Sequence, residues 1–342
     1  MARSNTSHPD APGLSRRDAL KAGAFGAMGL AAAGSAVAFQ RPEAASQGPQ
    51  HLHAMGVGGE VDLSLFDPTR YLTEFDRGQV STLPTGQTLR EFDVVAVDKA
   101  IEVAPGVLFD AWTYNGQVPG PTLRCSEGDR LRIRFQNAGS HPHTIHFHGI
   151  HPADMDGVFE AVEPGGSYTY EFDAHPAGVQ LYHCHAVPLK RHIHKGLYGM
   201  FIIDPPGGLE PARELVMAMN GFDTNYDGEN EVYAANTVAF HYQRHPIVIE
   251  KGELVRVYLG NFTEFDLINS FHLHGNFFRY WKTGSRPDHF EWTDTVMLCQ
   301  GERGVMEFTF EHLGRFMFHA HQSEFAELGW MGLFEVKERT LA

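Results

Sequence analysis

A cysteine between two histidines, His183-Cys184-His185, is the part of the sequence best suited to metal chemistry. Successive side chains of a β-strand point to opposite faces. If this segment is a strand, the two histidines share one face and the cysteine points to the other. Imidazole and thiolate are ligands of copper, zinc and iron. The spacing therefore predicts two metal sites on opposite faces of one segment, an arrangement that suits electron transfer.

A second histidine-rich segment complements the first. Strand alternation puts His146 and His148 on one face of this segment and His143 on the other. We expect His143 to lie beside Cys184, together with His192, which follows the cysteine after a loop. Two histidines, one cysteine and a weak axial position form the blue-copper ligand set. The other four histidines would then form half of a larger metal cluster on the opposite face.

Both segments recur downstream with two informative changes. The recurrence supplies four further histidines at the same spacing: His272, His274, His319 and His321. Asn269 stands where His143 stands, and Ala320 stands where Cys184 stands. The second copy therefore keeps the cluster histidines and lacks the thiolate site. Together the segments predict one blue-copper site and eight clustered histidines.

The recurrence extends beyond the histidines. Residues 127–133 match residues 251–257, and residues 196–202 match residues 329–335, which indicates a duplicated domain. The expected strands are short, rich in β-branched and aromatic residues, and separated by turns of Gly, Pro and Asp. No long helical periodicity occurs after the N-terminal region. We predict an all-β fold of two tandem Greek-key β-sandwich domains.

Composition along the chain places the boundaries. The first domain is expected at residues 89–205 and the second at residues 211–338, joined by a linker rich in proline and glycine. Residues 39–88 are expected to form an N-terminal lead and arm. Residues 1–38 are typical of a twin-arginine signal peptide, because Arg16-Arg17 precede an apolar run too short for a membrane span. This predicts export to the periplasm or beyond, with no stable membrane anchor.

The overall composition limits the function classes. The 342 residues carry a net charge of −15, which argues against binding to nucleic acid or anionic membranes. Histidine is abundant, at 21 residues, and cysteine is rare, at three. Cys125 and Cys299 could form a disulfide or remain as buried free thiols. We favour buried thiols because the two cysteines lie in different repeats.

The four ordered His-x-His pairs, the central His-Cys-His segment and their flanking glycines resemble the multicopper oxidases. With two such domains, the chain is similar to the two-domain, laccase-like members that keep the blue copper in the first domain. The resemblance covers roughly residues 65–338. It implies that each domain is a cupredoxin-like sandwich.

The resemblance implies a ligand set for the blue copper. The ligands would be His143, Cys184 and His192. The spacing in the family places Leu197 at the axial position, and because leucine cannot coordinate, a raised reduction potential is expected. Two alternatives stay open at this point. Met200 could be the axial residue, and His194 could replace His192.

The resemblance also implies a trinuclear copper cluster, so that a functional unit holds four coppers. Its ligands would be His146, His148, His183, His185, His272, His274, His319 and His321. His146 and His272 would hold the mononuclear type 2 copper, and the other six the type 3 pair. Asp156 and Glu324 match acids that the family places near the cluster to supply protons. In the two-domain relatives the cluster lies between neighbouring subunits of a homotrimer, which is therefore the expected assembly.

These features favour a laccase-like oxidase that takes single electrons from a phenol, an aromatic amine or a metal ion and reduces dioxygen to water. Copper nitrite reductase is an alternative that shares the trimer and the blue copper. That family, however, has an aspartate where this chain has His146, and its catalytic copper needs three histidines. A copper carrier or tolerance protein is a further alternative, but it would not need a blue copper joined to a cluster.

Overall fold

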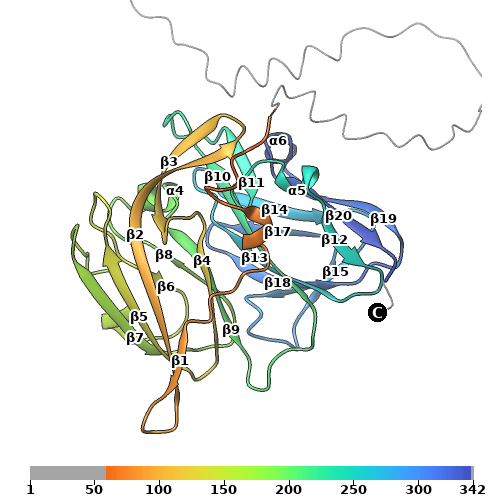
Figure 1. The fold of residues 1–342 in the computed structure, drawn as a ribbon. Helices are drawn as coiled ribbons and strands as arrows, with labels where there is room; N and C mark the ends of the chain where they lie inside the picture. Colours follow the sequence, from red (N-terminus) through yellow and green to blue (C-terminus); the bar gives the residue numbers. More distant parts are fainter. Residues whose placement is uncertain (1–58, 340–342) are drawn as a thin grey trace, which may run out of the picture. The chain divides into compact units, whose positions relative to one another are not determined.

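The structure, a computed structural model, describes residues 59–339 (Figure 1). The predicted signal peptide and the first part of the predicted lead lie outside these residues. Within them the chain forms four β-sheets and a few short helices, so the predicted all-β fold is confirmed. No helix in this part of the chain is both long and apolar enough to cross a membrane.

The first two sheets belong to the first half of the chain. One has the strand order β1-β2-β5-β7 with β3 paired to β2, and the other has the order β4-β9-β8-β6. The strands are β1 (Gln79–Thr82), β2 (Thr88–Ala104), β3 (Val107–Tyr114), β4 (Gly120–Ser126), β5 (Arg130–Asn137), β6 (His146–Phe147), β7 (Ser167–Asp173), β8 (Gly178–His183) and β9 (Tyr198–Asp204). The short helices are α3 (Pro68–Tyr71), the 3-10 helix η1 (Ala153–Met155) and α4 (Leu189–His194), of which α4 connects β8 to β9.

Residue alternation in β5 shows why the first sheet forms where it does. Leu131, Ile133 and Phe135 are at most 1% exposed and point into the core of the first domain. Arg134 points to the opposite face and donates from its Nε to Asp93 Oδ1 of β2 at 2.7 Å. A one-residue shift would expose the apolar set and bury the arginine, so the register of β5 against its neighbours is strongly specified.

The second half of the chain forms the other two sheets. Their strand orders are β11-β10-β13-β18-β15-β16 and β12-β20-β19-β14-β17. The strands are β10 (Arg213–Phe222), β11 (Val232–Ala235), β12 (Ile247–Glu250), β13 (Val255–Asn261), β14 (Ile268–Leu273), β15 (Phe278–Lys282), β16 (Glu291–Thr293), β17 (Thr295–Cys299), β18 (Arg303–Phe308), β19 (Gly314–His319) and β20 (Met331–Lys337). The helices are α5 (His241–Arg244) and α6 (Ser323–Glu327), and α6 lies between β19 and β20 as α4 lies between β8 and β9.

Strand pairing repeats between the two halves, as the sequence match predicts. The parallel pairs β2–β5 and β4–β9 correspond to the parallel pairs β10–β13 and β12–β20. The antiparallel pair β6–β8 places His146 opposite His183, and β14–β19 places His272 opposite His319. The same pairing therefore brings the first and second histidine segments together in each domain.

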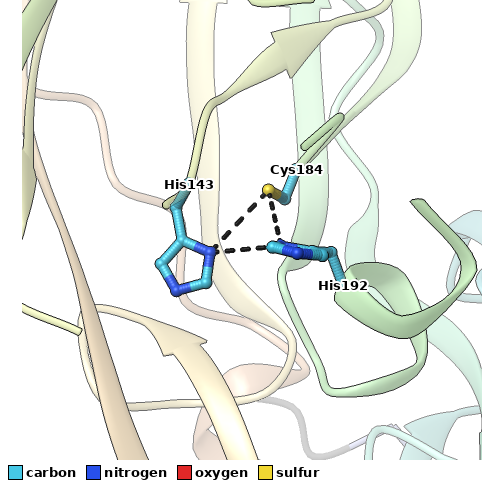
Figure 2. A group of neighbouring side chains, drawn as sticks. All are labelled: His143, Cys184 and His192. Carbon is cyan, nitrogen blue, oxygen red and sulfur yellow. Dashed lines mark hydrogen bonds between the residues drawn. The ribbon is translucent and has the colours of Figure 1, made fainter. Parts of the chain in front are cut away.

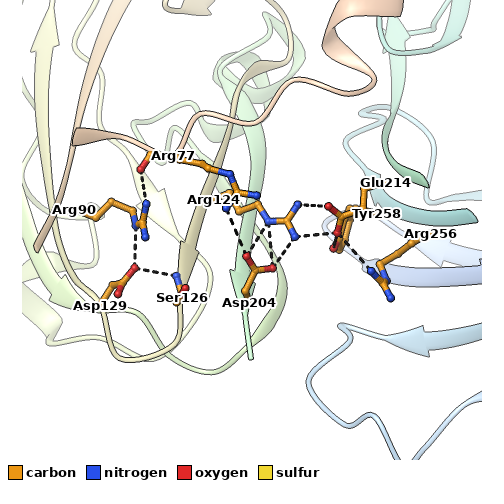
Figure 3. Close-up of polar contacts among 9 residues, drawn as sticks. All are labelled: Arg77, Arg90, Arg124, Ser126, Asp129, Asp204, Glu214, Arg256 and Tyr258. Carbon is orange, nitrogen blue, oxygen red and sulfur yellow. Dashed lines mark hydrogen bonds and ion pairs between the residues drawn. The ribbon is translucent and has the colours of Figure 1, made fainter. Parts of the chain in front are cut away.

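Arg124 of β4 links the two domains (Figure 3). Its guanidinium donates to Asp204 at the end of β9 at 2.8 Å and to Glu214 at the start of β10 at 2.7 Å. Arg256 of β13 lies 3.5 Å from Glu214 and 2.6 Å from Glu307, which extends the network into the second domain. The Arg124 side chain is only 5% exposed. The ion pair between Arg124 and Glu214 therefore joins the two domains, because breaking it would leave a buried guanidinium with one carboxylate partner fewer.

The structure corrects one of the two cysteine predictions. Cys125 and Cys299 are both free. Cys125 is 1% exposed in the core of the first domain, as expected. Cys299 is exposed, so the prediction of a buried thiol is wrong there. In β17 the buried positions are Val296 and Leu298, and alternation turns the last residue of the strand to solvent.

Candidate metal centres

Three ligand atoms converge on one point in the first domain (Figure 2). Cys184 Sγ lies 3.3 Å from His192 Nδ1 and 4.0 Å from His143 Nδ1, and the two nitrogens are 3.2 Å apart. All three residues are at most 3% exposed. Metal–ligand bonds of about 2.0–2.3 Å would place the ligands of a trigonal site roughly 3.5 Å apart. The observed triangle fits a single metal ion with two imidazoles and a thiolate.

Short backbone links hold this triangle together. The amide of Cys184 donates to Leu197 O at 2.9 Å, and the amide of Leu197 donates to His192 O at 3.3 Å. Because α4 is only six residues long, these bonds return His192 to the end of β8. The amide of Thr144 donates to Cys184 Sγ at 3.4 Å, which ties the His143 segment to the sulfur.

The electrostatics of the triangle favour metal over protons. Burial lowers the pKa of His143 and of His192 to about 4, so both imidazoles are neutral and able to coordinate at neutral pH. Burial also raises the pKa of the Cys184 thiol, against the opposing effect of the Thr144 amide. Binding of a metal cation would therefore favour deprotonation of the Cys184 thiol, because a cysteine coordinates metal as the thiolate.

The structure distinguishes the alternatives that the sequence left open. Leu197 is fully buried in the same core cluster as Cys184. Met200 points to the other side of β9, where its sulfur packs against Gly260 of the second domain. His194 also faces away from the sulfur, because its Nε2 accepts the amide proton of Asp223 at 3.1 Å. The geometry therefore groups His192, and not His194, with His143 and Cys184, while the axial role of Leu197 stays a prediction.

The opposite face of the same segment carries the first group of cluster histidines. His148 Nε2 and His183 Nε2 face each other at 3.2 Å, and one ligand atom each from His146, His148 and His183 lie within 4.8 Å of one another. The ring of His185 is 5.4 Å from that of His146. All four rings are partly exposed at the edge of the sheet, where a further ligand can reach them.

Hydrogen bonds fix the tautomers of this group. His146 Nδ1 donates to Asp156 O at 2.8 Å, and His183 Nδ1 donates to Cys184 O at 3.0 Å. In both rings Nε2 is left with a free lone pair. Metal-binding histidines characteristically donate their second ring N–H to such a carbonyl or carboxylate. Burial lowers the pKa of His148 to about 3 and that of His183 to about 4, so these rings are also neutral.

The second domain builds the same group from its own residues. His274 Nε2 lies 2.9 Å from His319 Nε2, and the ring of His272 is 5.3 Å from that of His321. His272 Nδ1 bonds to Asp294 O at 3.0 Å, and His319 Nδ1 donates to Ala320 O at 2.6 Å. Both backbone acceptors match those of the first group, and His272 Nδ1 also lies 2.8 Å from Thr295 Oγ1, a contact without a counterpart at His146.

The two groups remain separate within one chain. Between residues 59 and 339, the ring contacts of the first group involve its own members and His151, and those of the second group involve its own members only. Each group opens on its own hollow, of about 500 Å³ beside His146 and about 670 Å³ beside His272. Each histidine group therefore lies beside a hollow of its own, and the joining of the two groups into one cluster stays a prediction.

The two predicted proton-supplying acids lie in different surroundings. Asp156 is half-buried, with Oδ1 3.1 Å from His146 Nδ1 and 3.7 Å from His151 Nε2, and it lines the hollow of the first group. Glu324 lies in the first turn of α6, three residues beyond His321. The role of either acid stays a prediction, and the position of Asp156 is the one that touches a cluster histidine.

Two features of the site escaped the sequence analysis. The ring of Trp112 packs 4.9 Å from His192 and 5.3 Å from His143, and the guanidinium of Arg191 covers it at 5.1 Å. An isolated tryptophan in a strand carries no signal of this role. His151 was also missed, although its short spacing from His146 and His148 was a usable signal.

Comparison with known proteins agrees with this geometry. Two family models, both described as multicopper oxidase, match residues 97–208 and 209–340. A solved structure described as a multicopper oxidase superposes with a TM-score of 0.80 at 55% identity, covering 81% of this chain and 100% of that one. The blue copper oxidase of Nitrosomonas europaea superposes with a TM-score of 0.67 at 29% identity, covering 72% and 86% of the two chains.

Curated relatives add a further comparison. The copper-containing nitrite reductase of Neisseria gonorrhoeae is 30% identical over 53% of this chain and 51% of that protein. The chain thus spans about half the length of this relative and of two similar nitrite reductases from Neisseria meningitidis.

Proposed function

This chain belongs to the multicopper oxidase family, and we propose that it is a laccase-like oxidase that passes single electrons from a donor to dioxygen and releases water. The family implies copper, and the donor sets described above fit it. When bound, copper would supply one-electron redox chemistry at His143, Cys184 and His192 and at the eight clustered histidines, four ions per functional unit. The other parts of the proposal concern what the protein's own residues do.

One observation carries the proposal. Cys184 contributes its sulfur to one site, while its carbonyl accepts the Nδ1 proton of His183, whose Nε2 faces the other site. The two sites therefore share a single residue and its neighbour. A carrier protein has no need of such a connection, whereas an enzyme that accepts electrons at one site and uses them at another does.

The donor is proposed to be an aromatic molecule. A cavity of about 720 Å³ beside α4 is lined by Lys190, Arg191, Tyr226 and Phe265 among others. Lys190 Nζ lies 4.2 Å from the centre of the Phe265 ring, so the cavity wall combines cations with aromatic faces. Asp223 and Asp227 line another part of the same cavity, so we place a phenol or aromatic amine against the aromatic part of the wall around Phe265.

Asp156 is proposed to hand protons to the dioxygen site. Its carboxylate reaches His146 and lines the hollow that the first histidine group shares with Arg303. A carboxylate in this position can take a proton from solvent and release it beside the ring. The corresponding residue of the second group is Asp294, whose Oδ1 lies 4.0 Å from His272 Nδ1.

The proposed assembly is a homotrimer in which each cluster forms between the first histidine group of one subunit and the second group of its neighbour. The separation of the two groups within one chain supports this assembly. A head-to-tail trimer would satisfy three pairs of half-sites at once. Export through the twin-arginine route to the periplasm or beyond is proposed on the sequence alone.

Complementation between inactive variants tests the assembly and the activity together. His148→Ala removes a ligand from the first group, and His274→Ala removes one from the second. Each variant alone should consume no oxygen with a phenolic donor. When both are co-expressed, every mixed head-to-tail trimer should have one intact interface out of its three, and roughly three quarters of random trimers are mixed, so roughly a quarter of wild-type activity should return. A mixture as inactive as its components would contradict an inter-subunit cluster.

The nitrite reductase relatives make nitrite reduction the second candidate. The four histidine pairs argue against it, because a nitrite-reducing copper needs fewer ligands than these two groups offer. The copper-loaded protein should consume oxygen with a phenol and form no nitric oxide from nitrite with a reductant present. Nitric oxide formation without oxygen uptake would replace the oxidase proposal.

A further inference from the structure

The loop between β10 and β11 carries oxygen-bearing side chains at regular intervals. Asp223, Asn225 and Asp227 alternate with other residues, Gly228 follows, and Glu231 ends the loop. This is the spacing with which the first half of an EF-hand loop presents oxygen ligands to calcium. The glycine has φ of 92°, a conformation that allows the chain to turn back on itself at that point.

The carboxylates of the loop converge. One oxygen each from Asp223, Asp227 and Glu231 lie within 4.8 Å of one another. Asp223 is 2% exposed and Glu231 is 3% exposed. The amides of Asp227 and Gly228 donate to the two oxygens of Asp223 at 3.1 and 2.8 Å, which wraps the loop around the first carboxylate.

One carboxylate oxygen in the group lacks any partner. Glu231 Oε2 accepts from the amide and the hydroxyl of Thr224 at 2.7 and 2.9 Å, but Glu231 Oε1 is buried without a hydrogen bond. Among residues 59–339, no lysine, arginine or histidine forms an ion pair with Asp223, Asp227 or Glu231, although Lys190, Arg191 and Lys195 line the same cavity as the two aspartates. Burying an unpaired carboxylate oxygen beside two other carboxylates is costly unless a cation is present.

Electrostatics support the same conclusion. The three carboxylates bring like charges together, and two of their residues, Asp223 and Glu231, are buried. A bound divalent cation would remove this repulsion. The donors are all oxygen atoms, which hard cations prefer and which copper does not.

We propose that residues 223–231 bind a resident calcium ion through Asp223, Asp227 and Glu231, at a site separate from the copper centres. Calcium suits the loop because it accepts irregular oxygen coordination completed by water, whereas magnesium demands a near-ideal octahedron. The binding itself does not depend on the proposed oxidase activity.

The loop also contacts the helix that carries a blue-copper ligand. The amide of Asp223 donates to His194 Nε2 at 3.1 Å, and Lys195 Nζ donates to Tyr226 Oη at 3.2 Å. His194 lies on α4, two residues from His192. Calcium bound in the loop would therefore restrain α4 through His194, on the side of the helix that faces away from Cys184 Sγ.

Calcium titration of the copper-loaded full-length protein tests the proposal. After treatment with a calcium chelator and reloading with copper, the protein should bind one calcium ion per subunit by calorimetry. Terbium should occupy the same site and luminesce through Tyr226, and calcium should displace it. Calcium should also raise the melting temperature. Absence of both calorimetric heat and terbium luminescence would overturn the proposal.

Matched variants locate the site. Glu231→Gln and Asp227→Asn should each weaken calcium binding at least tenfold, and Asp227 is exposed, so its variant should fold normally. Glu229→Gln makes the same charge change in the same loop, outside the converging group, and should bind calcium like the parent protein. Equal binding by Asp227→Asn and Glu229→Gln would refute the site, as would tighter binding of manganese than of calcium.

Discussion

The two domains use equivalent connections, the one that contains α4 and the one that contains α6, for different purposes. In the first domain the Cys184 amide bonds to Leu197 O and the Leu197 amide bonds to His192 O. In the second domain the Ala320 amide bonds to Trp330 O at 3.1 Å and the Trp330 amide bonds to Phe325 O at 2.9 Å. Equivalent backbone positions therefore hold a metal-binding triangle in one domain and an apolar filling in the other.

The filling of the second domain is aromatic. Trp330 is fully buried, with its ring 5.8 Å from that of Phe318, and Phe325 stacks on Tyr233 at 4.1 Å. Asn269, in the place of a copper histidine, donates to Thr263 Oγ1 at 3.1 Å. Aromatic packing therefore stabilises this region of the second domain, whereas metal bonds are expected to stabilise the equivalent region of the first.

The difference teaches how far the two faces of a strand are independent. The loss of the thiolate site left the cluster histidines of the second domain unchanged, down to the hydrogen bond from His319 to Ala320 O. Because alternate side chains face opposite ways, one face can exchange metal ligands for a hydrophobic core without moving the other. Variants that act on one face only should test this independence.

Replacing Cys184 by serine should have the largest effect. The blue absorbance and donor oxidation should both be lost, because the thiolate of the electron-accepting site is gone. The other three coppers should remain, since they bind on the opposite face. Metal analysis, absorbance and oxygen uptake measure these outcomes. Cys299→Ser, at an exposed thiol, is the control and should retain full activity.

Replacing Trp330 by alanine should destabilise the second domain by about 3–5 kcal/mol, because it empties the space of a fully buried ring. The loss should be the same with and without copper, as measured by denaturant unfolding. In contrast, Cys184→Ser should lose more stability in the copper-loaded protein than in the copper-free one, because only the former also loses a metal bond. A copper-dependent effect of Trp330→Ala would show that the two faces are coupled.

Ala320→Cys places a thiol at the position equivalent to Cys184. We expect no second blue site, because Asn269 and Phe325 supply no imidazole, and a stability loss of about 1–3 kcal/mol from overpacking against Trp330. Absorbance and chemical denaturation check both points. A new blue band would mean that the remaining ligands can be recruited from elsewhere.

Leu197→Met should have the smallest effect on stability, below about 1.5 kcal/mol, because the two side chains have similar volumes. It should lower the reduction potential of the blue copper, because a thioether can coordinate weakly where leucine cannot. A redox titration of the variant against the parent protein measures the change. Met200→Leu is the matched control and should leave the potential unchanged, since that sulfur faces Gly260.

The elements that the sequence predicted well depend on local alternation. His143 and Cys184 meet because each lies on the opposite face from its neighbouring histidines, and that parity is visible in the sequence. Such parity is a property of single strands, which the chain encodes locally. The axial role of Leu197, implied by the family resemblance, stays a prediction.

The elements that the sequence did not predict depend on contacts between distant segments. Trp112 reaches His192 from β3, and Phe325 reaches Tyr233 from another part of its domain. Exposure of Cys299 depends on where β17 ends. Hydrophobic periodicity in the sequence does not indicate which side chains meet across sheets, because tertiary packing decides those contacts.

Arg124 has a consequence for how the molecule melts. Separating the two domains would break the ion pair between Arg124 and Glu214, which leaves Arg124 with Asp204 and Glu214 with Arg256 and so removes the charge contact that joins the halves. We therefore expect calorimetry to record one cooperative transition for both halves of the chain. The two sandwich domains would therefore unfold together, although each has its own hydrophobic core.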